Sequence, residues 1–121
     1  MTDPRAQLAA VRRYYELVDA DDVPGLVALF APECVYRRPG YEPLRGREEL
    51  EGFYTGERVI AAGRHEIAAA VVDEGGVAVH GTFEGTLKDG SARSLRWADF
   101  YTFTGEGLFA TRDTFFFAPL V

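Results

Sequence analysis

The chain contains very little cysteine, histidine and tryptophan: one Cys, two His and one Trp in 121 residues. The single cysteine, Cys34, excludes an intramolecular disulfide and any zinc site built from several cysteines. It lies next to Val35, and a lone cysteine in apolar company is typical of a small core residue. No spacing of ligand-type residues indicates a metal site, so we expect neither a metal nor another cofactor.

Basic residues are also in deficit, since the net charge is −6 and the pI is about 4.9. Nucleic acid is therefore not an expected partner, because binding a phosphate backbone requires an excess of Lys and Arg. No apolar run reaches the length of a membrane span, and the first residues, MTDPRAQ, lack the apolar region of a signal peptide. We expect a cytoplasmic protein with no membrane partner.

Hydrophobic residues make up 47% of the chain and aromatic residues 13%, which with this length predicts one domain, residues 1–121. Apolar residues at helical spacing predict three helices, at 4–20, 23–30 and 47–54. Val-, Thr- and aromatic-rich segments between Gly-containing turns predict strands at 34–37, 64–72, 77–87, 91–104 and 108–118. Helices followed by an antiparallel meander indicate an α+β fold, with the helices packed on one face of the sheet.

The last two hairpins determine which side chains share a face of the sheet. The turn at 105–107 predicts Asp99 opposite Asp113, and the Asp-Gly pair at 89–90, typical of a two-residue turn, sets His80 opposite Asp99. His80, Asp99 and Asp113 then form a row across three strands on an aromatic face, as expected of a pocket. A shift of one residue in either register would break this row.

The same pattern predicts a second, partly apolar face on this sheet. We expect it to carry six residues: Val77, Val79, Phe83, Ala98, Phe100 and Phe116. Since the helices would cover the first face, the second would be exposed, and a large exposed apolar patch usually marks an interface. We therefore expect a homodimer through this face.

Several short motifs make nearly the whole chain resemble one known superfamily. They are Arg13-Tyr14, the segment 22–31, Glu42-Pro43 with Arg45-Gly46, Phe53-Tyr54, and Asp99-Phe100. With the order of elements, they resemble the nuclear transport factor two-like superfamily, in its ketosteroid isomerase-like and SnoaL-like branch. The resemblance implies a curved antiparallel sheet wrapped by three N-terminal helices into a cone.

The resemblance also implies roles for particular residues. In ketosteroid isomerases an Asp removes a proton next to a carbonyl, while a Tyr and a protonated Asp donate hydrogen bonds to the resulting oxyanion. Matching motifs place Tyr14 at the oxyanion tyrosine, Tyr54 at its supporting tyrosine and Asp99 at the protonated aspartate. The position of the base holds Arg38, which stays protonated and cannot abstract a proton.

Two interpretations of function stay open. In the first, Asp113 or His80 is the base of a cofactor-free enzyme that enolises a small hydrophobic carbonyl compound, for double-bond isomerisation or polyketide-type cyclisation. In the alternative, favoured by Arg38, the protein binds a hydrophobic ligand without catalysis. In both, we expect six residues at the ligand: Tyr36, Arg38, Tyr54, Trp97, Tyr101 and Phe115.

Overall fold

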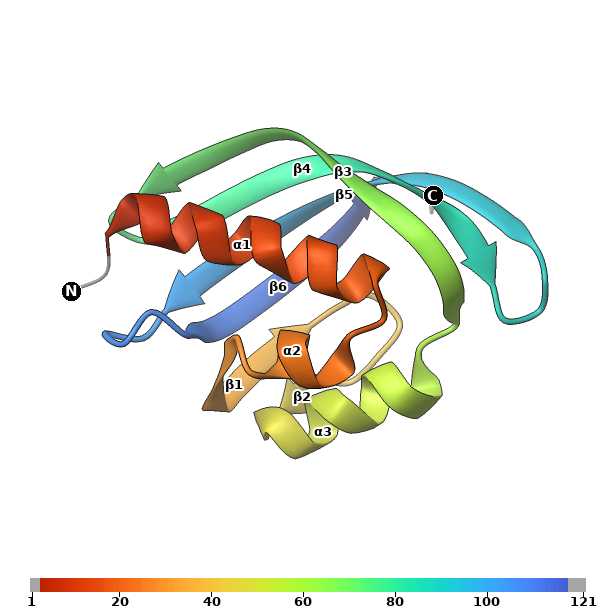
Figure 1. The fold of residues 1–121 in the computed structure, drawn as a ribbon, viewed down its shortest axis with the longest axis horizontal. Coiled ribbons are helices and arrows are strands. Elements are labelled where there is room, and N and C mark those ends of the chain that lie inside the picture. Colours follow the sequence, from red (N-terminus) through yellow and green to blue (C-terminus); the bar gives the residue numbers. More distant parts are fainter. Residues whose placement is uncertain (1–2, 118–121) are drawn as a thin grey trace.

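A computed structural model describes residues 3–117 of the chain, so the predicted domain limits at 1 and 121 and the end of strand 108–118 lie outside the described residues. Six strands form one curved sheet in the order β2-β1-β6-β5-β4-β3, which arches over α1 (Figure 1). The helices are α1 (Pro4–Asp19), α2 (Val23–Val27), α3 (Gly46–Gly52) and the π-helix η1 (Phe53–Glu57). The strands are β1 (Phe30–Arg37), β2 (Leu44–Arg45), β3 (Ile60–Asp73), β4 (Gly76–Leu87), β5 (Ala92–Phe103) and β6 (Phe109–Phe117). The predicted α+β class is confirmed.

Helix α1 forms where the sequence predicts it. Asp3 caps it by accepting a hydrogen bond from the Arg5 backbone N–H at 3.0 Å, and Pro4 occupies the first turn. Its buried face packs under the sheet and consists of Val11, Tyr14, Tyr15, Leu17 and Val18. No helix within the described part of the chain is long and apolar enough to cross a membrane.

Helix α2 is shorter than predicted, because the chain enters β1 at Phe30. The Leu29 carbonyl accepts a hydrogen bond from the Phe109 backbone N–H at 2.9 Å, and Phe30 pairs with Phe109. Sheet pairing thus overrides the helical periodicity of residues 28–30. This β1–β6 pair is parallel, whereas the remaining pairs of neighbouring strands are antiparallel. The sheet is therefore mixed, whereas the prediction was a wholly antiparallel sheet.

The predicted register between β5 and β6 is wrong by one residue. The turn itself is as expected: Gly107 lies at φ +87°, and the Thr104 backbone N–H donates to the Leu108 carbonyl. A bulge then inserts Ala110 into β6, so that Asp99 lies opposite Thr114. Beyond that bulge every β6 side chain points to the other face from the predicted one.

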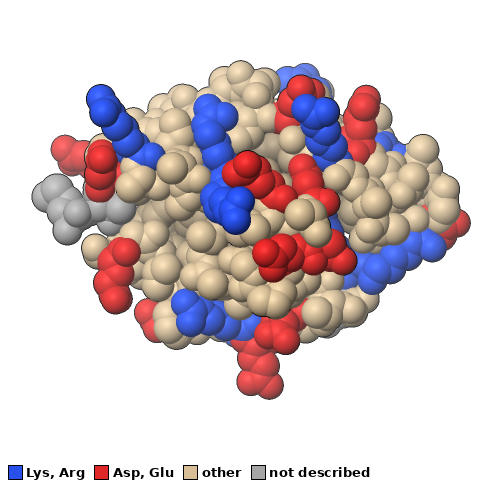
Figure 2. All heavy atoms as spheres, in the orientation of Figure 1, with Lys and Arg blue, Asp and Glu red and all other residues tan. Residues whose placement is uncertain are grey.

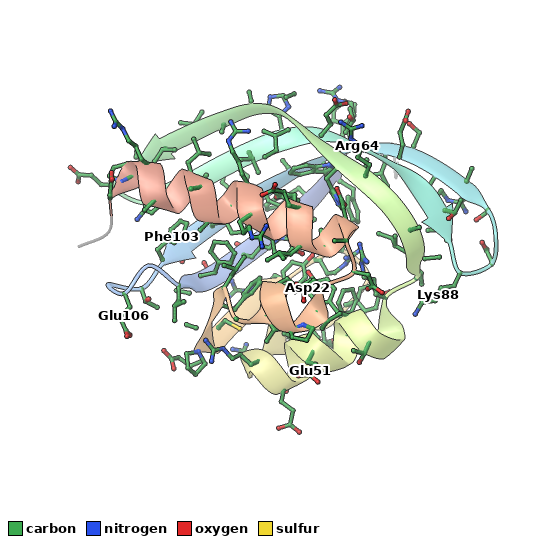
Figure 3. The ribbon with its side chains drawn as sticks, in the orientation of Figure 1. Asp22, Glu51, Arg64, Lys88, Phe103 and Glu106 are labelled. Atoms are coloured by element: carbon green, nitrogen blue, oxygen red, sulfur yellow. The ribbon has the colours of Figure 1, made fainter. Side chains whose placement is uncertain are left out.

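The predicted register between β4 and β5 is also wrong by one residue. Lys88, Asp89 and Gly90 form a three-residue loop, with Gly90 at φ +87°, in place of the predicted two-residue turn. The Leu87 backbone N–H therefore donates to the Ser91 carbonyl. Val79 lies opposite Asp99, and His80 is paired with Ala98. Lys88 and Glu106 mark the turns at the two ends of β5 in Figure 3.

These two shifts redistribute the predicted faces. Four of the six residues expected on the exposed face lie on the inner side: Val77, Val79, Phe83 and Phe116. Ala98 and Phe100 are on the outer face as predicted. Three residues predicted at the pocket, His80, Asp113 and Phe115, lie on the outer face, away from the helices. Each is paired with Ala98 or Phe100 of β5 and not with an inward-facing residue, because both registers are displaced by one residue.

Candidate functional site

A cavity of about 200 Å³ lies on the inner side of the sheet. Exposure falls along β5 from Arg93, which is exposed at the mouth, to Asp99, which is 1% exposed at the floor. Leu95 and Trp97 line the wall between them. Further apolar and aromatic wall comes from β1, β3, β4 and β6, and includes Tyr36, Ile60, Phe83, Leu87 and Phe116.

Asp99 accepts hydrogen bonds from three donors at this floor. The Tyr15 hydroxyl donates to Oδ2, and the Thr114 hydroxyl donates to Oδ1. Arg112 Nη2 lies 2.9 Å from Oδ2 in an ion pair. Tyr101 donates to the Tyr15 oxygen at 2.7 Å, which leaves the Tyr15 proton for Asp99. An ion pair contains a carboxylate, whereas the role implied by the resemblance requires a neutral Asp99 that donates.

Arg112 is 5% exposed and lies at the centre of a group of phenols. Its Nη1 donates to the hydroxyls of Tyr14, at 2.8 Å, and Tyr54, at 3.2 Å. The guanidinium carbon lies 4.4 Å from the Tyr14 ring centroid and 4.5 Å from that of Tyr36. Burial lowers the pKa of Arg112, but the Asp99 carboxylate and the surrounding tyrosines raise it by more. The resulting pKa is well above the usual value for arginine, so Arg112 keeps its charge.

Burial also raises the pKa of four phenols, those of Tyr14, Tyr15, Tyr54 and Tyr101, and the Arg112 guanidinium opposes this rise. The desolvated phenolate is disfavoured because water can no longer solvate its charge. Four protonated hydroxyls therefore surround the ion pair. Those of Tyr14, Tyr15 and Tyr54 hydrogen-bond to it directly, and that of Tyr101 bonds to Tyr15.

Raising the pH above about 10, where tyrosines of an unfolded chain ionise, should unfold this protein before its buried phenols titrate. The native state then binds more protons than the unfolded state, so the free energy of unfolding falls as the pH rises through this range. Absorbance at 295 nm and far-UV circular dichroism should show at least four of the six tyrosines ionising together with loss of the fold. Ionisation of all six with an unchanged dichroism spectrum would contradict this.

The cavity wall also includes a histidine that the sequence reasoning did not select. His65, on β3, has Nδ1 at 2.7 Å from Asp19 Oδ1, which accepts a hydrogen bond from it, and its backbone N–H donates to Asp19 Oδ2 at 2.9 Å. Its ring packs between Tyr15, Phe83 and Trp97. A carboxylate at Nδ1 favours the tautomer with the proton on that nitrogen, which leaves Nε2 with a lone pair. Among residues 3–117, no three His, Cys, Asp or Glu side chains are placed to hold a metal ion.

The structure brings together part of the predicted catalytic set. Asp99 lines the cavity, and Tyr14 lies buried behind it. His80 and Asp113 lie on the outer face, where Asp113 pairs with Arg37 at 3.2 Å. The predicted row of three polar residues therefore does not exist, because it depended on two registers that are each displaced by one residue.

The predicted ligand-contact residues divide in the same way. Three of them line the cavity: Tyr36, Arg38 and Trp97. Tyr54 and Tyr101 are buried in the phenol group around the ion pair, and Phe115 is 55% exposed on the outer face. Arg38 stacks on the ring of Phe53, with its guanidinium carbon 5.0 Å from the centroid.

The class defined by this geometry is an α+β protein with a curved sheet, helices on its concave side and a polar floor to an apolar cavity. The chain belongs to the SnoaL-like domain family, whose model matches residues 11–111. This confirms the family expected from the sequence motifs.

Several solved structures share the fold. An NTF2-like protein of unknown function from Burkholderia pseudomallei superposes with a TM-score of 0.84 at 22% identity, over 97% of this chain and 92% of that one. SalBIII, described as an epoxide hydrolase/cyclase-like enzyme in pyran ring formation, gives 0.83 at 21% identity, over 97% and 95%. TerC, crystallised with polyporic acid, gives 0.81 at 18% identity, over 93% and 92%. At these identities the likeness establishes the fold alone.

Proposed function

We propose that this protein is a cofactor-free acid–base enzyme that enolises a small hydrophobic carbonyl compound. The observation that supports this most directly is the His65–Asp19 pair, because it provides an oriented imidazole in the wall of an apolar cavity. The Asp99–Arg112 ion pair supports the proposal further, because it holds two charged groups in fixed positions at the cavity floor, where a bound substrate would be shielded from water. His65 thus takes the place of the bases considered from the sequence, His80 and Asp113.

The proposed step is a proton transfer. Nε2 of His65 takes a proton from the carbon next to the carbonyl, the C–H electron pair becomes a C=C bond, and the carbonyl oxygen takes the negative charge. Arg38 Nη1 and the Tyr36 hydroxyl, 3.5 Å apart in the cavity wall, are the donors for this oxygen. Return of the proton to another carbon gives isomerisation, and attack of the enolate carbon on a second carbonyl of the same molecule gives ring closure.

A second function uses the same cavity without chemistry: binding of a hydrophobic ligand. Arg38 favours it, because an arginine stands where the resembling isomerases carry their base. The description of SalBIII as a cyclase-like enzyme supports the catalytic proposal instead. The two differ in whether a bound carbonyl compound exchanges its protons.

Proton exchange in D₂O tests enolisation without knowledge of the natural substrate. A panel of small hydrophobic ketones is incubated with the protein, and loss of the signals from protons next to the carbonyl is followed by ¹H NMR. Catalysed exchange of at least one ketone supports the enzyme. If the NMR signals of a ketone broaden on binding but its protons exchange no faster than in buffer alone, the result supports the binding module instead.

We also propose that the outer face of the sheet joins two copies of this chain. Val71, Ala78 and Phe100 are paired neighbours across β3, β4 and β5, and the rings of Phe100 and Phe115 meet edge to face with centroids 5.7 Å apart. Phe100 is 52% exposed and Phe117 is 72% exposed. In a dimer with two-fold symmetry, the same patch of each copy faces the other, so an exposed apolar patch can be buried against its counterpart.

Replacing both Phe100 and Phe115 with serine should convert a dimer into a monomer, because the substitutions remove the apolar centre of the face. Light scattering after gel filtration measures the mass of each. Val59→Ser, at an exposed apolar residue of the cavity wall, is the matched control and should leave the dimer intact. A monomeric wild type at micromolar concentration would contradict the proposed interface.

A further inference from the structure

The charge of the cavity wall differs from that of the protein as a whole. Four arginines line the cavity, Arg38, Arg58, Arg93 and Arg112, against one aspartate, Asp99. The chain carries a net charge of −6, and acidic and basic side chains are interspersed over the face in Figure 2. The one carboxylate in the wall is already engaged by Arg112, Thr114 and Tyr15. The cavity therefore has three positive charges that its own wall does not balance.

The three remaining guanidiniums have no carboxylate partner among the described side chains. Arg38 donates to the Tyr36 hydroxyl and stacks on aromatic rings. Arg93 donates to the carbonyl of Ala92, and Arg58 lies over the ring of Tyr54. Hydrogen bonds from Ser91 lower the pKa of Asp89 and Arg93 adds to this lowering, yet Arg93 and Asp89 form no ion pair. These arginines are held by aromatic and carbonyl contacts that leave their charge uncompensated.

Unsatisfied buried polar atoms in the described structure point to the same deficit of acceptors. They are Arg38 Nε, Trp97 Nε1 and Arg112 Nε, all three belong to cavity-lining residues, and all three are donors. The described residues include no buried side-chain oxygen that lacks a partner. A region rich in donors and poor in acceptors binds a molecule that supplies acceptor oxygens.

We infer that the cavity takes a small apolar molecule that carries a negative charge, with a carboxylate as the group that the arginines recognise. Guanidinium matches carboxylate geometry and forms the stronger, charge-assisted hydrogen bonds. Arg93 and Arg58 occupy the mouth, and the aromatic wall between Leu95 and Phe116 takes the apolar body. That this molecule is the substrate rests on the proposed function. That it binds in the cavity does not, because binding requires no turnover.

A pair of probes with one shape and two charges tests this inference. trans-Cinnamate is an anion at pH 7.5, and trans-cinnamamide is its neutral counterpart. Isothermal titration calorimetry gives both affinities, and fluorescence of Trp97, the one tryptophan of the chain, reports occupation of the cavity. We expect cinnamate to bind at least about tenfold more tightly, a difference that corresponds to about 1.4 kcal/mol. Raising the salt concentration should weaken the binding of cinnamate and leave the affinity for the amide unchanged.

The double variant Arg58→Gln/Arg93→Gln should lose most of the preference for cinnamate while keeping its affinity for the amide. Arg38 is left intact because it packs on Phe53 and Phe116. Arg64→Gln is the matched control, since Arg64 lies on β3, is 81% exposed and points away from the core (Figure 3). It changes the net charge in the same direction and should leave the preference unchanged.

Each outcome decides the inference. Equal affinities for the two probes, or no binding of either at millimolar concentration, would overturn it. The inference would also be overturned if Arg64→Gln reduced the preference for cinnamate as much as the single variants Arg58→Gln and Arg93→Gln do. The effect would then come from the overall charge of the protein. Ketone exchange without preferential cinnamate binding defeats this inference alone, whereas preferential binding without exchange defeats the proposed enzyme alone.

Discussion

Replacing Arg112 with methionine should lower the free energy of unfolding by about 3–5 kcal/mol, which is a large part of the total for a domain of this size. The substitution leaves the Asp99 carboxylate buried at 1% exposure without its countercharge. It also removes the donor to the hydroxyls of Tyr14 and Tyr54. Urea unfolding followed by circular dichroism measures the change.

The double variant Asp99→Leu/Arg112→Met should be more stable than Arg112→Met alone by about 2 kcal/mol or more, because it removes the unpaired charge as well. The hydroxyls left behind retain partners in one another: Tyr14 contacts Tyr54, and Tyr101 contacts Tyr15. The same variant separates stability from activity. A folded double variant that no longer exchanges ketone protons would show that the ion pair acts in turnover and not merely in folding.

Arg37→Met is the matched control for this pair. Arg37 is also bonded to an aspartate of the sheet, Asp113, at 3.2 Å, but the two side chains are 52% and 38% exposed. Exposed pairs are screened by water and contribute about 0–1 kcal/mol. A loss on Arg112→Met no larger than that on Arg37→Met would contradict the assignment of Asp99–Arg112 as the central interaction of the site.

The order of elements could be predicted from the sequence because it depends on local signals. Asp3-Pro4 at the start of α1, glycines in the turns, and alternating aromatic and Val residues in β4–β6 each act within a few residues. The short β2 and the π-turn of η1 were not predicted. Strand β2 depends on a partner outside its own segment, because Arg45 pairs with Val35 of β1.

The site could be predicted only in part, because side-chain facing depends on register and register depends on single residues. A left-handed Gly90 and an inserted Ala110 each shift one strand pair by one position, and each shift moves a whole set of side chains to the other face. The predicted register puts Asp113 on the pocket face, so alternation along the strand leaves its neighbour Arg112 on the outer face. Its burial is possible only because Asp99 and several tyrosines, distant in sequence, surround its charge.

His65 was missed for a related reason. Its partner, Asp19, stands at the end of α1, 46 residues away, so no local motif links the two. The signal that could have found it is scarcity, because the chain has two histidines. The β3–β4 register pairs His65 with Phe83, which lies on the inner side. Once His80 is assigned to the outer face, His65 is the imidazole that remains for proton transfer.

Replacing His65 with glutamine should therefore lower catalysed ketone exchange by about 10²–10⁴-fold, the range for loss of a general base. Glutamine keeps a polar side chain next to Asp19 but offers no basic nitrogen to the cavity. The pH–rate profile should also differ from that of the wild type, because the variant carries no imidazole at this position. Kinetics by NMR at several pH values measure both effects, and urea unfolding shows whether the variant folds.

His80→Gln provides the matched control, because it makes the same chemical change on the outer face and should leave exchange unchanged. Asp19→Asn should lower kcat with little change in KM, since an amide can donate to Nδ1 and so select the tautomer with a protonated Nε2. If the pair were purely structural, Asp19→Asn would instead destabilise the fold, and the protein that remained folded would have an unaltered pH–rate profile. If His65→Gln exchanged ketone protons at the wild-type rate, His65 would not be the base, and another group would have to carry the proton transfer.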